Sequence, residues 1–130
     1  MIVAGSNGLP LRSDIMTPEQ FVNQIRKSVV EENLSVYKDL FSSTEVQNAT
    51  DPYWQRALQL YAALNSERKD VLFEIIRQVM VDTISNVFAI LDGVSQLSGQ
   101  EGDFTLLAND PPEQLNGELQ DRFLEFEENV

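Results

Sequence analysis

The sequence has neither cysteine nor histidine among its 130 residues. Without cysteine there is no disulfide, thiol nucleophile, iron–sulfur cluster or thiolate zinc site. Without histidine there is no Ser-His-Asp or Cys-His triad and no histidine-ligated haem. Oxygen donors for Ca²⁺ or Mg²⁺ remain, but the acidic turn at 92–101 lacks the alternating ligands of a calcium loop. We therefore expect no catalytic residue, no metal and no cofactor.

Basic residues are scarce as well, with 9 against 21 acidic residues and a net charge of −12. This charge repels nucleic-acid phosphates and anionic membrane surfaces. No apolar run approaches the roughly 18 residues of a transmembrane helix. The first residues have no basic segment and no sustained apolar segment, so they do not resemble a secretion signal. The sequence predicts a soluble cytoplasmic protein that binds neither nucleic acid nor membrane.

The acidic residues concentrate near the C-terminus. Residues 98–130 hold nine acidic residues and one basic residue, a net of −8. A helix predicted at about 115–128 places four carboxylates together on its polar face: Glu118, Asp121, Glu125 and Glu128. Such a face attracts a basic protein surface over a distance. A solubilising helix face, which needs no partner, is the alternative interpretation.

Two helix starts are marked by a capping residue followed by proline. Thr17 precedes Pro18, and Asp51 precedes Pro52, so each first residue caps a helix whose first position proline fits. We predict helices from these points, the second reaching about residue 65. The first helical stretch has a weak interruption at residues 33–35, and residues 42–50 form a loop. Residues 1–16, with two glycines and a proline, form an irregular arm.

The segment 67–91 is the longest helix that the sequence predicts. It contains no glycine or proline, and its apolar residues cover roughly 220° of a helical wheel. One neighbour cannot cover so wide an arc, so we expect a central helix with Ile76 and Val79 almost fully buried. Gly93 follows its end, and apolar pieces at 94–97 and 104–107 predict a small β-hairpin.

Together these patterns predict a mainly α fold. Residues 17–130 form a single-domain bundle of four to five helices around the central helix 67–91, with a possible small hairpin near 94–107 and an acidic C-terminal helix.

Three further residues are candidates for a site. Tyr53 and Trp54 lie in the first turn of their helix, where they serve either as partner anchors or as core packing. Arg77 falls inside the apolar arc of the central helix. We expect it to pair with a carboxylate, since an unpaired buried guanidinium is costly; a pocket arginine that binds an anion is the alternative.

The function that these features favour is a non-enzymatic protein–protein interaction module of the inhibitor, immunity or adaptor type. Its acidic face would meet a basic protein partner. A small-ligand-binding or carboxylate-dependent enzymatic domain is the alternative. A homo-oligomer formed through an uncovered part of the apolar arc is compatible with both functions.

Overall fold

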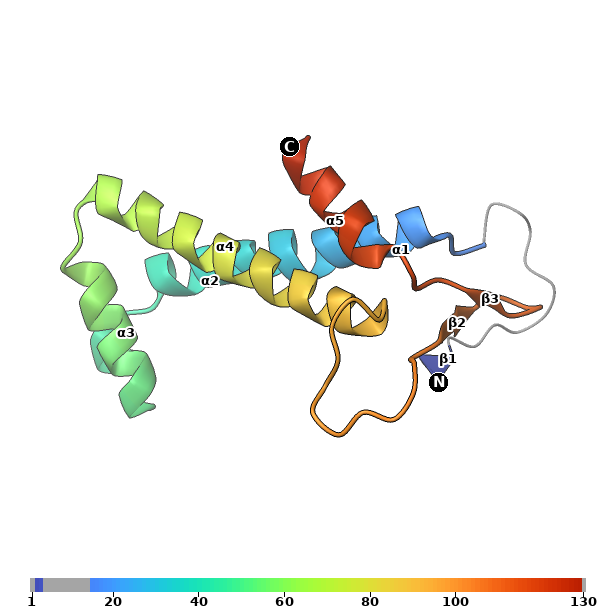
Figure 1. Cartoon of the computed structure of the whole chain (residues 1–130). Helices are drawn as coiled ribbons and strands as arrows, with labels where there is room; N and C mark the ends of the chain where they lie inside the picture. Colours follow the sequence, from blue (N-terminus) through green and yellow to red (C-terminus); the bar gives the residue numbers. More distant parts are fainter. Residues whose placement is uncertain (1, 4–14, 130) are drawn as a thin grey trace. The chain divides into compact units, whose positions relative to one another are not determined.

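The computed structural model describes residues 2–3 and 15–129, and these are mainly α-helical, as predicted (Figure 1). The chain divides into two compact units. The middle unit comprises Ser28–Val81, and the terminal unit combines Met1–Lys27 with Asp82–Val130. The helical elements, in chain order, are α1 (Pro18–Ile25), the π-helical η2 (Arg26–Glu31), α2 (Glu32–Ser43), the 3₁₀ turn η3 (Val46–Asn48), α3 (Pro52–Ala62), α4 (Ser66–Leu91) and α5 (Leu119–Glu128).

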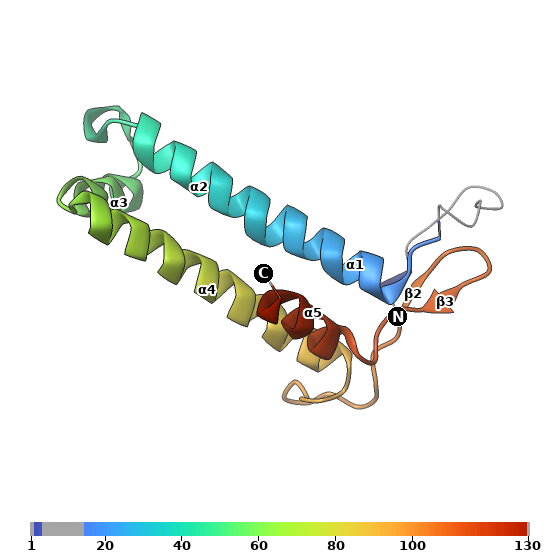
Figure 2. The ribbon, with the colours of Figure 1, turned by 90° about the horizontal axis from the view of Figure 1, so that it is seen from above.

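The first helix begins where its capping signal predicts. Thr17 Oγ1 accepts a hydrogen bond from the backbone N–H of Gln20 at 3.1 Å, and Gln20 Oε1 accepts one from the N–H of Thr17. The predicted interruption at residues 33–35 is wrong, because helical backbone continues from Pro18 to Ser43 (Figure 2). The irregularity lies earlier, in η2, and it is a widened helical turn rather than a break.

The next two helices also begin at side-chain caps. Asp51 Oδ1 accepts from the N–H of Tyr53 at 2.9 Å, which confirms the predicted start of α3. Asn65 Oδ1 accepts from the N–H of Arg68 at 2.8 Å at the start of α4. The bounds of α4 agree closely with the predicted helix 67–91.

The core of the terminal unit is built on three aromatic rings. The ring of Phe88 in α4 lies 6.1 Å from that of Phe21 in α1 and 5.6 Å from that of Phe123 in α5. Phe123 is fully buried, and so are Val22 of α1 and Leu119 of α5. Helix α1 thus packs against α5 through an apolar layer.

A small sheet completes this unit, at a different place from the predicted hairpin. Strand β2 (Leu106–Ala108) pairs antiparallel with β3 (Glu113–Gln114) and parallel with β1 (Ile2–Val3). Residues 94–103 contain turns and bends but no strand, and Gly99 and Gly102 there have positive φ angles, which are typical of turns. Part of the predicted arm, Ile2–Val3, is therefore a strand, and residues 4–14 lie outside the described residues.

The buried side chain of Asn116 holds three segments of the terminal unit together. Its Oδ1 accepts from the N–H of Leu106 in β2 at 2.8 Å. Its Nδ2 donates to the carbonyl of Phe104 at 2.8 Å and to the carbonyl of Leu91, the last residue of α4. A carbonyl at a helix end has no partner within its helix, so this bond supplies one.

A second polar side chain, Asp92, connects the end of α4 to the start of α5. Its two carboxylate oxygens accept from the N–H groups of Gly117 at 2.7 Å and Gln120 at 2.8 Å. Glu118, the residue at the N-cap position of α5, makes no capping hydrogen bond with its own side chain. The helix is therefore capped by a residue far away in the sequence.

We predict that Asn116→Ala lowers the free energy of unfolding by about 3 kcal/mol, because it leaves three buried or partly buried backbone groups without this partner. Urea denaturation measures the loss. The matched control is Asn129→Ala, which removes one exposed hydrogen bond to the carbonyl of Glu125 and should cost less than about 0.5 kcal/mol. Equal losses in the two variants would contradict the role assigned to Asn116.

Candidate functional site

The apolar arc of α4 is only partly covered, although the sequence predicts a central helix with its apolar residues buried. Val79 is 58% exposed, so its predicted burial is wrong, and Ile76 is only half-buried. In the middle unit the buried positions of α4 are instead Phe73 and Val81. The wheel identifies how wide the apolar surface is, but within this unit α2 and α3 do not cover all of it.

Three side chains form an exposed apolar stripe on α4. Val71, Ile75 and Val79 are 45%, 56% and 58% exposed. Their spacing of four residues places them in one row along the helix. We call this row the α4 ridge.

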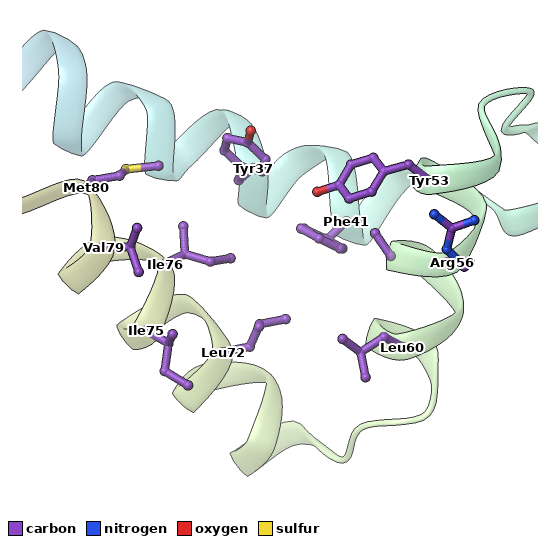
Figure 3. Close-up of a pocket in the computed structure, with 11 residues that line it drawn as sticks. Tyr37, Phe41, Tyr53, Arg56, Leu60, Leu72, Ile75, Ile76, Val79 and Met80 are labelled. Carbon is purple, nitrogen blue, oxygen red and sulfur yellow. The ribbon is translucent and has the colours of Figure 1, made fainter. Parts of the chain in front are cut away.

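Beside the ridge lies a groove of about 600 Å³, which we call the apolar groove. In Figure 3, Leu72 and Ile76 from α4 and Leu60 from α3 point toward the space between these helices. The lining residues come from α2, α3 and α4: Tyr37, Phe41, Tyr53, Arg56, Ala57, Leu60, Leu72, Ile75, Ile76, Val79 and Met80. Every one of them belongs to the middle unit.

An aromatic cluster around Phe41 supports the groove. The ring of Phe41 stacks on that of Tyr61 with centroids 5.0 Å apart and lies 5.1 Å from the ring of Trp54 and 6.0 Å from that of Phe73. The ammonium group of Lys69 lies 4.6 Å from the centroid of Tyr61 on the same cluster. Aromatic side chains have few rotatable bonds, so holding them in this packing costs little conformational entropy.

The adjacent aromatic residues that the sequence singled out have different environments. Trp54 is half-buried and packs against Phe41 within the aromatic cluster. Tyr53 is 64% exposed and lines the apolar groove. Trp54 is therefore part of the aromatic packing, whereas Tyr53 is left at the surface.

Arg56 on α3 is the one charged side chain that lines the apolar groove. It is exposed, and within residues 2–3 and 15–129 it forms no ion pair. A guanidinium beside an apolar surface is suited to binding a carboxylate in a partly dehydrated setting. The groove thus has one positively charged side chain, although the net charge of the protein is −12.

The other arginine of interest, Arg77, has the carboxylate partner that the sequence predicts. Its Nη2 lies 2.8 Å from Glu31 Oε1, with side-chain exposures of 27% and 41%. Arg77 does not line the apolar groove but a smaller depression beside Phe73 and Glu74. An ion pair accounts for this arginine without a ligand.

The acidic face lies on α5. Glu118, Asp121, Glu125 and Glu128 are all exposed, while Leu119 and Phe123 on the same helix are buried. Arg122 forms ion pairs with Glu118, at 3.1 Å, and with Glu19 of α1. Glu118 is therefore partly neutralised, which leaves the other three carboxylates to dominate this face.

The described residues contain no cluster of three or more aspartate or glutamate side chains placed to hold a metal ion. In the same part of the chain, no helix is long and apolar enough to cross a membrane. Comparisons with models of known protein families, with curated proteins and with solved structures found no match.

The uneven burial of α4 predicts opposite outcomes for two valines that are two residues apart. Val79→Ala should lower the free energy of unfolding by less than about 0.5 kcal/mol, because its side chain is mostly in water. Val81→Ala, at a position that is 5% exposed, should cost about 2 kcal/mol through lost burial and a cavity. Urea titration followed by the fluorescence of Trp54 measures both. Similar losses would place Val79 in the core.

Proposed function

We propose that this protein is a non-enzymatic protein–protein interaction module whose apolar groove binds an amphipathic α-helix of another polypeptide. The observation that carries this proposal is the groove of about 600 Å³, lined almost entirely by apolar side chains and bordered by the exposed α4 ridge. Contiguous apolar surface of this kind is the usual sign of an interaction site in a water-soluble domain.

The exposure of the groove's borders favours a helix over a thin small molecule. Tyr53 and Leu60 on α3 are 64% and 58% exposed, and Val79 on α4 is 58% exposed. An acyl chain lying at the bottom would leave these borders in water. A helix, about 10–12 Å wide with its side chains, can contact both α3 and α4.

The alternative of a carboxylate-dependent enzyme finds less support in the groove. Among the described residues that line it, the polar groups are the guanidinium of Arg56 and the hydroxyls of Tyr37 and Tyr53. A pair of carboxylates with different roles is what such catalysis requires. No lining residue supplies even one carboxylate.

The proposal is tested with a displayed library of helical peptides randomised on one face. Selection against the wild-type protein should enrich peptides with large apolar residues at i, i+4 and i+7 or i+8. The counter-selection uses Ile75→Glu, and the control variant is Val36→Glu, an exposed position on α2 outside the groove. The selected peptides should lose at least about tenfold in affinity for Ile75→Glu and bind Val36→Glu as they bind the wild type. Equal binding to all three proteins would overturn the proposal.

The acidic face of α5 supports a second candidate, a basic protein partner. The terminal unit carries 13 acidic and four basic residues in its sequence, a net of −9, against −3 for the middle unit with eight and five. Concentrated exposed charge accelerates encounter with a surface of opposite sign. This interaction needs no apolar contact and is independent of the groove.

Charge reversal on α5 tests this second candidate. We expect the wild type to capture a basic protein from a native extract at about 50 mM salt, and the variant Glu125→Lys combined with Glu128→Lys to lose this capture. The wild type should lose it too at about 500 mM salt, because salt screens the attraction between the charges. Both positions are exposed, so stability should change by less than about 1 kcal/mol. The control is Glu45→Lys combined with Asp39→Lys in the middle unit. Capture that survives both the reversal and the salt would exclude the acidic face.

A further inference from the structure

We infer that the helix bound in the apolar groove is α4 of a second copy of this chain, so that the protein forms a two-fold dimer through its middle unit. The inference rests on the proposed function and names the partner of the same groove. Three features support it: the α4 ridge is a helical row of apolar side chains, charged side chains of opposite sign lie beside the ridge and in the groove, and two-fold symmetry closes the assembly at two chains.

The chain itself presents the element that the groove requires. An occupant must offer a row of apolar side chains on a helix, and the α4 ridge is such a row, with all three members about half exposed. Ridge and groove lie next to each other in the middle unit, because Ile75 and Val79 of the ridge also border the groove. A surface that holds both a ridge and a matching groove is complementary to itself, as a symmetric dimer interface must be.

The charges beside the ridge match the charge in the groove. At about 100° per residue, Glu67 and Glu74 lie along one edge of the ridge, whereas Leu72 and Ile76, which line the groove, lie along the other edge. Both glutamates are exposed. The groove offers Arg56 as its single charged side chain. An incoming α4 therefore carries carboxylates on the side opposite to its own groove.

In the proposed dimer the two copies are related by a two-fold axis parallel to α4, so every contact between ridge and groove is made twice. The rotation about this axis sets the ridge of each copy in the groove of the other. The edge with Glu67 and Glu74 then faces α3 of the other copy, on which Arg56 lies. Each contact occurs twice, and the assembly closes at two chains instead of growing into a filament.

The distribution of net charge favours this surface for a contact between identical chains. Two copies carry −12 each and repel one another at long range. The middle unit accounts for only −3 of that charge, so an interface formed by it brings together the less charged parts of the two sequences. The apolar residues there gain most from leaving water.

The first measurement is the mass in solution by sedimentation equilibrium from about 1 µM to about 1 mM protein. The wild type should approach twice the chain mass of 14.7 kDa. Val79→Glu should stay monomeric over the same range, and Val36→Glu should behave as the wild type. A wild type that remains monomeric throughout overturns the inference, while peptides selected on the groove would leave the proposed function standing.

The second measurement uses charge reversals that only a second copy can complement. Arg56→Glu places like charges opposite each other twice in its homodimer, and so does Glu74→Arg. Each variant alone should dimerise at least about tenfold more weakly than the wild type. Mixed in equal amounts, the two variants restore both opposite-charge pairs, so a heterodimer should form with nearly wild-type affinity.

Circular dichroism of each variant verifies that the helices are intact, which is expected because both positions are exposed. Recovery on mixing supports the inference. Dimers that form equally well in the wild type and in both single reversals, or variants that fail to recover on mixing, overturn the arrangement with Glu74 facing Arg56.

Discussion

The terminal unit depends on one buried amide. The side chain of Asn116 has two hydrogen-bond functions, and the structure uses both: the oxygen fixes the first residue of β2, and the nitrogen satisfies the carbonyls of Phe104 and of the last residue of α4. An amide carries its donor and its acceptor in a fixed geometry. The side chain of Asn116 therefore fixes the positions of Leu91, Phe104 and Leu106 relative to one another. Asp92, directly after α4, caps the start of α5 and so fixes where that helix begins. On the helix that Asp92 caps, Phe123 packs its ring edge-on against that of Phe88.

The middle unit uses aromatic packing in place of buried hydrogen bonds. Phe41 of α2 contacts rings from both α3 and α4, so three helices share one apolar centre. The aromatic cluster lies beside the groove, and the groove side of α4 is lined by the aliphatic residues Leu72, Ile75, Ile76, Val79 and Met80. The aromatic cluster does not extend over the α4 ridge, so the ridge stays exposed to water.

Local signals in the sequence predicted local structure well, and the starts of α1 and α3 follow from Thr17 and Asp51 because a cap is a contact between near neighbours. The wheel of α4 was less informative about burial, since periodicity shows which face is apolar but not whether a neighbour covers it. The hairpin was predicted at the wrong place because the strand β2 is held by the side chain of Asn116, ten residues further along the chain, and a local pattern does not show this contact. The groove could not be predicted from the sequence either, because its lining residues come from three helices. Arg56 could be placed beside an apolar surface only once these helices were seen together.

The two units also differ in the length of chain that must be closed to form them. All residues of the middle unit lie within one stretch, Ser28–Val81, whereas the terminal unit joins Glu19 to Arg122 and Met16 to Asn109, pairs separated by 103 and 93 positions. Short-range contacts form faster because they close smaller loops. On a ribosome the middle unit is therefore fully synthesised while the partner segments of α1 are still to come. All residues that line its apolar groove are therefore made before the acidic helix α5.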